Sequence, residues 1–137
     1  MSKVSGICSG FLLPGSWVCA VSDLESGELS PAMQVSSLSD SWVTLHPEGE
    51  DSVPSTYPYE MLRPINLTEF ILRRSGFVFD DLSLTYRRAC LCVRAWGDSF
   101  SVMGYHFHHV HELQLLMAAA GISPLEVKLD YCHVCSE

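Results

Sequence analysis

The feature that most constrains the fold of this 137-residue chain is a change in the spacing of its apolar residues near Pro64. Before Pro64 the apolar residues form short runs separated by glycine, proline and serine, which is typical of short strands joined by turns. After Asn66 they recur at helical spacing, because Leu67, Phe70 and Ile71 fall on one helical face. The sequence therefore predicts a β-rich part followed by a part that combines helices with strands.

Three strands are predicted in the β-rich part. Several short strands at this spacing are typical of a small barrel. Trp17 and Trp42 fall within the strand patterns, so we expect both in the core of the barrel. The predicted strands cover residues 15–21, 33–38 and 42–45.

A first helix is predicted over about residues 67–75. Asn66 and Glu69 have the spacing of a capping box, and Thr68 is a competing N-cap. Gly76 lies where a left-handed residue that ends a helix belongs. Capping chemistry therefore predicts both ends of this helix.

A β-hairpin is predicted after the first helix. Its arms cover residues 82–96 and 100–107, and Gly97 with Asp98 forms the turn between them. This hairpin is expected to lie between two helices.

A second helix is predicted after residue 109, and Gly121 follows it as the expected C-cap. The remaining tail, residues 125–137, is a candidate for one last strand. The apolar face of the helix consists of Val110, Leu113, Met117 and Ala120.

Two segments of the chain resemble a known family in their order and separation. Residues 63–77 read RPINLTEFILRRSGF, and residues 109–121 read HVHELQLLMAAAG. They are similar to the segments PIPLTEEILLKCGF and YVHQLQNLYFALTG of small uncharacterised proteins of Bacteroidetes, their phages and mobile elements. Members of that family often begin with an IGNWV strand, and residues 15–18 of this chain read GSWV.

The resemblance spans residues 15–122, and it departs from the family pattern at a few positions of the second segment. Glu112, Leu115 and Met117 stand where the family usually has glutamine, asparagine and an aromatic residue. The resemblance implies a phage or mobile-element context, and it brings no assigned activity and no catalytic residues. It also favours an SH3-like form for the small barrel.

Together these patterns predict an α+β fold in two parts. Residues 1–62 are expected to form a small SH3-like β-barrel. Residues 63–137 are expected to form a helix–β-hairpin–helix unit with a C-terminal tail.

Charge is unevenly distributed along the chain, whose formal net charge is −8. Residues 1–62 contain one base and eight acids, whereas residues 63–137 contain seven bases and eight acids. The acidic part repels phosphates, so we do not expect it to bind nucleic acid. An acidic surface can instead occupy a basic groove of a protein partner, which makes Glu48, Glu50 and Asp51 candidate binding residues.

No apolar run approaches the roughly 20 residues that a membrane-spanning helix needs. Pro14 and Gly15 interrupt the first apolar stretch, and only Lys3 precedes it, so we expect no signal peptide. We therefore expect a protein of the host-cell cytoplasm, with its six cysteines reduced.

The cysteines and histidines raise the question of a metal site. Cys132 and Cys135 have zinc-knuckle spacing, and Cys90 and Cys92, expected on one side of a strand, would complete four ligands. We favour cysteines that pack as small apolar groups, and we expect neither a metal nor another cofactor. A histidine run offers a second set of ligands, and it comprises His106, His108, His109 and His111.

His111 and Gln114 lie one helical turn apart, and His111 matches the histidine of the family segment. An imidazole titrates near neutral pH and suits acid–base catalysis. However, no carboxylate, serine or cysteine lies at a sequence spacing from His111 that is typical of a catalytic group. We therefore list both residues as candidate binding residues, assign no catalytic residue, and do not expect an enzyme.

These observations predict a non-enzymatic accessory protein of a phage or mobile element that binds a host protein, with inhibition of a defence system as its candidate role. Two alternatives stay open. One is a nucleic-acid-binding regulator that uses the arginines between Arg63 and Arg88. The other is a metal-dependent hydrolase built on the histidines of residues 106–111.

Overall fold

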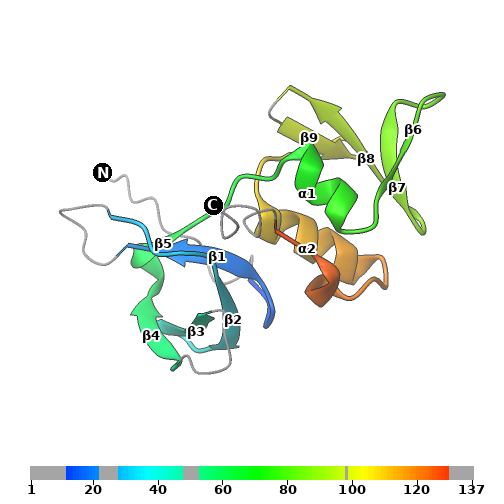
Figure 1. Cartoon of the computed structure of the whole chain (residues 1–137). Helices are drawn as coiled ribbons and strands as arrows, with labels where there is room; N and C mark the ends of the chain where they lie inside the picture. The colour runs from blue at the N-terminus through cyan, green and yellow to red at the C-terminus, as the bar shows by residue number, and fades with distance from the viewer. Residues whose placement is uncertain (1–11, 22–27, 48–52, 98, 130–137) are drawn as a thin grey trace. The chain divides into compact units, whose positions relative to one another are not determined.

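The structure is a computed structural model, and it describes residues 12–21, 28–47, 53–97 and 99–129. The chain separates into two compact units with a boundary between Ile65 and Asn66 (Figure 1). We call residues 1–65 unit 1 and residues 66–137 unit 2, and we describe each unit by itself.

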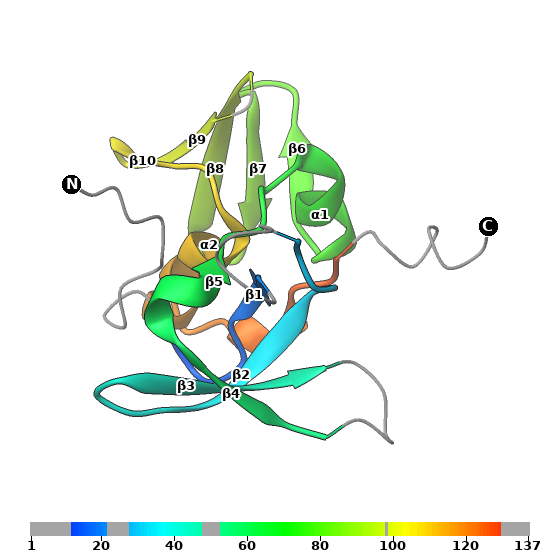
Figure 2. The same ribbon diagram turned by 90° about the vertical axis from the view of Figure 1, so that its left-hand side faces the viewer.

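Unit 1 contains a five-stranded sheet with the order β4-β3-β2-β1-β5, in which every neighbouring pair is antiparallel. Figure 2 shows that this sheet curls into a half-barrel. A single turn of 3₁₀ helix, η2 (Tyr59–Met61), connects the last two strands. The strands are β1 (Trp17–Ala20), β2 (Met33–Leu38), β3 (Trp42–Pro47), β4 (Ser55–Pro58) and β5 (Leu62–Arg63).

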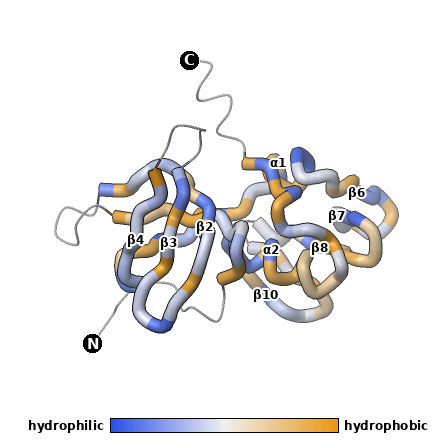
Figure 3. Tube along the Cα trace, turned by 90° about the horizontal axis from the view of Figure 1, so that it is seen from below, coloured by the Kyte–Doolittle hydropathy of each residue, from blue (hydrophilic) through white to orange (hydrophobic). Residues whose placement is uncertain are grey.

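The core of unit 1 comes from alternate residues of its strands, because successive side chains of a strand point to opposite faces. Figure 3 shows the resulting alternation of hydrophobic and hydrophilic segments along β2 and β3. The buried cluster consists of Leu12, Val18, Ala20, Met33, Val35, Val43, Leu45 and Leu62.

The expectation that Trp17 and Trp42 lie in the core is wrong for Trp42, which is 52% exposed. Trp42 directly precedes Val43, which is fully buried, so its side chain belongs to the outer face of β3. Trp17 likewise precedes a buried valine and is only partly buried. The three strands predicted from the sequence are confirmed as β1, β2 and β3, while β4 and β5 were not predicted.

Unit 2 contains a second five-stranded antiparallel sheet, in which each strand lies beside its neighbour in sequence. The helices α1 (Glu69–Arg74) and α2 (Val110–Ala119) precede and follow this sheet, and the 3₁₀ turn η3 (Pro124–Glu126) comes after α2. The strands are β6 (Val78–Asp80), β7 (Thr85–Arg88), β8 (Leu91–Trp96), β9 (Ser99–Val102) and β10 (Tyr105–Phe107).

The sequence predicted one hairpin between the two helices, and the structure has a meander of five strands there. Three of its turns contain a non-glycine residue with positive φ, namely Leu84, Ala89 and Met103. Such residues rarely adopt this conformation, so nothing in their chemistry marks a turn. Gly97, between β8 and β9, and Gly104, between β9 and β10, both have positive φ, and only the turn at Gly97 was predicted from the sequence.

Helix α1 is capped as its sequence predicts. The Thr68 hydroxyl accepts a hydrogen bond from the Ile71 amide at 3.2 Å, so Thr68 is the N-cap in place of Asn66. Gly76 adopts a φ of +92°, and the amide that follows it, that of Phe77, donates to the carbonyl of Leu72. This is the Schellman arrangement, which needs a left-handed residue at this position.

Helix α2 ends in the same way, since Gly121 has a φ of +82° and the Ile122 amide donates to the carbonyl of Met117. The described residues thus form an α+β fold. Within this part of the chain, neither helix is long and apolar enough to cross a membrane.

Candidate binding surface

The sheet of unit 2 has two chemically different faces, which its register defines. Asp80, Thr85, Arg94, Ser101 and His106 are successive cross-strand partners and form one row across all five strands. Residues two positions away along a strand share the same face. We call this face the open face, and it consists of Val78, Asp80, Thr85, Arg87, Cys92, Arg94, Trp96, Ser99, Ser101 and His106.

The opposite face of the sheet forms the core of unit 2 together with the helices. Helix α1 reaches this face at Tyr86, whose hydroxyl donates to the Glu69 carboxylate and accepts from Arg73 at 3.1 Å. Burial and the Glu69 carboxylate raise the pKa of Tyr86 above its usual value. The buried apolar set comprises Tyr86, Leu91, Val93, Phe100, Val102 and Phe107 of the sheet and Val110, Leu113 and Met117 of α2.

On the open face, large side chains lie in solvent. Trp96 is 60% exposed and Val78 is 70% exposed, and Arg87, Cys92, Arg94 and His106 are also exposed. The shorter Thr85 and Ser101 flank Arg94 and are buried. A tryptophan and two arginines exposed on one face of a regular sheet are the composition typical of an interaction surface.

The open face carries excess positive charge at its centre. Arg87 lies 3.6 Å from the carboxylate of Asp80. Hydrogen bonds from the Leu82 amide and the Ser83 hydroxyl occupy that carboxylate and lower the pKa of Asp80. Arg94 has no hydrogen-bond or ion-pair partner within the described ranges of the chain, so its guanidinium is available to a ligand.

The structure sets His106 apart from the other three histidines of the predicted run, whose rings lie 6.0 Å (His108 and His109) and 5.7 Å (His109 and His111) apart. His106 lies on the open face, His108 follows β10, and His109 is the N-cap of α2. The Glu112 carboxylate accepts the backbone amides of His108 and His109 at 3.2 Å each, so it closes the N-terminus of α2. Across the residues that the structure describes, no three His, Cys, Asp or Glu side chains are placed to hold a metal ion.

His111 and Gln114, the two candidate binding residues on α2, are both buried. His111 is 5% exposed, and burial lowers its pKa to about 4. Its ring stacks on that of His109 at 5.7 Å, while its Nδ1 has no hydrogen-bond partner among the described residues. Gln114 donates from Nε2 to the carbonyl of Pro124 at 2.9 Å. Both side chains are enclosed within unit 2, and their part in binding stays a prediction.

The acidic candidates Glu48, Glu50 and Asp51 lie outside the described residues, and so do Cys132 and Cys135. Cys90 and Cys92 were expected on one side of a strand, and this is wrong. Cys90 lies in the turn before β8 and Cys92 lies within β8 on the open face. The thiol of Cys90 is 3.9 Å from the carbonyl of Ala120, which follows α2.

The predicted arginine cluster is also dispersed. Arg63 belongs to unit 1 and donates to the carbonyls of Glu60 and Leu62. Arg73 contacts Tyr86, and Arg87 lies on the open face. Arg74 and Arg88 instead line one pocket, together with Ser75, Gly76, Glu126 and Lys128. The arginines therefore form no single basic patch.

The sequence analysis did not single out Arg94 and Trp96, which are both exposed on the open face. The signal that could have found them is the alternation of β8, where buried Leu91 and Val93 alternate with exposed Cys92 and Arg94.

Comparison of the chain with models of known protein families, with curated proteins and with solved structures gave no match.

Proposed function

We propose that this chain is a non-enzymatic binding module that contacts a protein partner through the open face of unit 2. The observation that carries this proposal is the exposure of Trp96 and Arg94 on a sheet whose other face is packed against helices. Tryptophan and arginine are the side chains most enriched among residues that dominate the energetics of protein interfaces.

The chemistry of the open face favours a partner surface that combines acidic and apolar side chains. Arg94 and Arg87 suit carboxylates, and Trp96 and Val78 suit an apolar contact between them. The resemblance described above supplies the proposed context, in which the partner is a host protein and the role is inhibition of a defence component.

Unit 1 is proposed to be an SH3-like barrel. Five short antiparallel strands, and a 3₁₀ turn between the fourth and the fifth, support this finer assignment. In this proposal unit 2 supplies the binding surface described here, and its two helices with the intervening sheet extend the predicted helix–hairpin–helix plan.

A second candidate function is binding of single-stranded nucleic acid on the same face. Exposed aromatic rings on a sheet can stack with bases while nearby arginines contact phosphates, and Trp96 with Arg87 and Arg94 offers these groups. The net charge of −8 disfavours this candidate, because the whole chain repels a polyanion.

The test is capture of a partner from host lysate with the full chain and with two variants, Trp96→Ala and Arg94→Ala. Trp42→Ala is the matched control, since Trp42 is similarly exposed but belongs to unit 1. We expect a protein that the wild type and the control retain and that both open-face variants lose, with weakening at high salt. Equal capture by all four proteins would contradict the proposal.

Mobility shifts with single-stranded DNA and RNA decide between the two candidates. The protein-binding proposal predicts no shift at physiological salt. A shift that Trp96→Ala abolishes, and that fades steeply with added salt, would replace it with the nucleic-acid candidate.

A further inference from the structure

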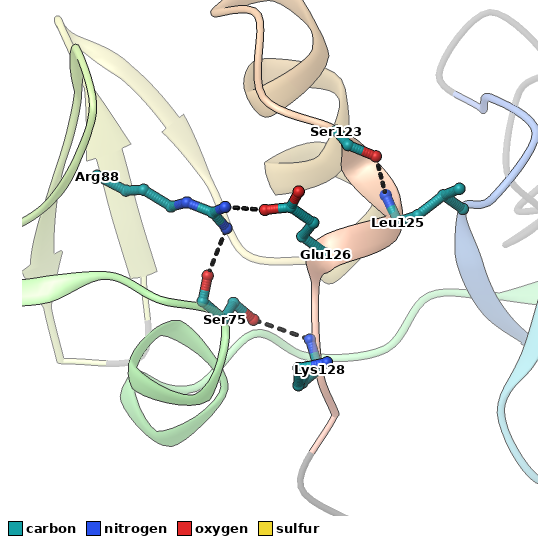
Figure 4. A network of polar contacts seen from close by, with 6 residues as sticks. All are labelled: Ser75, Arg88, Ser123, Leu125, Glu126 and Lys128. Atoms are coloured by element: carbon teal, nitrogen blue, oxygen red, sulfur yellow. Dashed lines mark hydrogen bonds and ion pairs between the residues drawn. The ribbon is translucent and has the colours of Figure 1, made fainter.

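A second surface of unit 2 has a different chemistry, and it is a pocket of about 340 Å³ at the C-terminal end of α1. Figure 4 shows the contacts that build one wall of it. Arg88 donates to the carbonyl of Ser75 at 2.7 Å and also pairs with the Glu126 carboxylate. The Ser75 hydroxyl in turn accepts the amide of Lys128 at 2.9 Å.

The side chains around this pocket are unbalanced in charge. Arg74, Arg88 and Lys128 are cations, whereas Glu126 is the single carboxylate in the lining. Arg74 stacks over the Phe70 ring at 5.8 Å, and within the described part of the chain neither Arg74 nor Lys128 pairs with a carboxylate. Two of the three cations are therefore available to an external anion.

The wall of the pocket is fixed before any ligand arrives. The amides of Ser75, Gly76 and Phe77 are used by the end of α1, so the ligand contacts would come from side chains. The Arg88 side chain lies beside Gly76, where a Cβ would be in ordinary contact with the guanidinium at 3.4 Å. Arg88 is thus held in place by the backbone and presents a planar pair of donors.

We infer that this pocket binds a phosphoryl group, which is a tetrahedral oxyanion with close to two negative charges. Arg74 and Lys128 neutralise its charge, and the Arg88 guanidinium keeps its bond to the Ser75 carbonyl and exchanges the Glu126 carboxylate for the ligand. Glu126 acts as an internal competitor, because its carboxylate occupies the guanidinium while the pocket is empty. The Arg88–Glu126 pair is partly exposed, with side chains 25% and 51% accessible, so a dianion can displace it at small cost.

The test is a titration of the full chain with inorganic phosphate, followed by NMR at constant ionic strength with chloride as the reference anion. O-phosphoserine is the second probe, and it distinguishes a phosphoryl group on a side chain from free phosphate. We expect saturable chemical-shift changes of the Ser75 and Gly76 amides with either probe. The probe that binds more tightly identifies whether the natural ligand is free phosphate or a phosphorylated side chain.

Four variants give the proposal its sharpest form. Lys128→Gln and Arg74→Gln should each weaken phosphate binding by about threefold to fivefold, and Glu126→Gln should strengthen it by a similar factor. Arg87→Gln is the matched control, because Arg87 is the neighbour of Arg88 in β7 but lies on the open face. Circular dichroism of each variant checks that the fold is retained.

Shifts that grow without saturation, or that chloride reproduces, would overturn the inference. So would an Arg87→Gln variant that weakens binding as much as Lys128→Gln, or a Glu126→Gln variant with unchanged affinity. These outcomes leave the protein-binding proposal untouched, because none of the pocket residues belongs to the open face.

Discussion

Units 1 and 2 each contain a five-stranded antiparallel sheet, and they differ in how the faces of that sheet are buried. Unit 1 curls its sheet and buries alternate residues such as Val18, Val35 and Leu45 inside the curve. In unit 2, α1 and α2 cover one face of the sheet, and among the described residues of this unit no helix or strand covers the other.

This difference shows in the large apolar side chains that remain exposed. Among the described residues, Leu29, Trp42 and Val53 are the exposed ones in unit 1, and only Trp42 lies within a strand. Unit 2 exposes nine, of which Val78 and Trp96 share the open face with two arginines. A sheet face that is exposed and has the composition of the open face offers a surface to bind.

The largest expected effect comes from emptying the core of one unit at a time. Leu45→Ala in unit 1 and Leu113→Ala in unit 2 should each lower the free energy of unfolding by about 2–5 kcal/mol, because both side chains are fully buried. Hydrogen exchange measured by NMR should show lost protection in the mutated unit only. Equal loss of protection in both units would mean that they do not unfold separately, which would break the comparison.

The next effect is acid sensitivity of unit 2 through His111. Burial lowers the pKa of His111 from 6.5 to about 4, so the unfolded chain takes up the proton first as the pH falls. This contribution to stability is complete above pH 6.5 and is lost towards pH 4, by about 2 kcal/mol at pH 5. Urea unfolding at pH 7 and pH 5 measures it in the wild type and in His111→Gln.

The His111→Gln variant should lose less stability between these two pH values than the wild type does. His106→Gln is the control, because His106 is exposed on the open face and should leave the difference unchanged. Identical pH dependence in His111→Gln and the wild type would show that His111 is not the group responsible.

A smaller effect is expected where α1 contacts the sheet. Tyr86→Phe removes the hydroxyl that joins Glu69 and Arg73, and it should cost about 1 kcal/mol in a urea unfolding curve. Tyr105→Phe serves as the comparison, since the Tyr105 hydroxyl donates to Glu112 at 3.2 Å from an exposed position. If both variants lose the same stability, the buried network adds nothing to the contact of α1 with the sheet.

The smallest expected effect is on stability when an exposed tryptophan is removed. Trp96→Ala and Trp42→Ala should each change the free energy of unfolding by no more than about 0.5 kcal/mol, because both residues are more than half exposed. Thermal or urea unfolding measures both. A loss of several kcal/mol in Trp96→Ala would show that the open face is a structural element, and it would remove the reason to regard it as a binding surface.

The capping residues made both helices predictable from the sequence. The separate strands of unit 2 were not predicted. Thr68, Gly76 and Gly121 act on the backbone within a few residues, so their sequence positions were enough. The turn before Leu84 has a local signal that was not recognised, because the Asp80 carboxylate accepts from the Leu82 amide two residues on, whereas the turn at Ala89 contains no residue typical of turns. An apparent hairpin in the sequence is therefore a larger meander in the structure.

The candidate surface needed the register of the sheet. Neighbouring Arg87 and Arg88 look like one basic cluster in the sequence, yet strand alternation sends them to opposite faces. The burial of His111 was likewise not predicted from the sequence, because the packing of α2 decides which of its residues are buried. The alternation along β8 was readable, but which of its faces the helices cover was not.

The most direct test of the open face as a binding surface uses two cysteines of this chain as reporters. Cys92 lies on the open face, whereas Cys90 lies in the turn before β8, and both are exposed. Thiol alkylation rates at each cysteine can be followed by mass spectrometry, with and without an excess of the captured host protein. We predict that the partner slows alkylation of Cys92 severalfold and leaves Cys90 unchanged. A bound partner that leaves Cys92 as reactive as in the free chain would contradict the account.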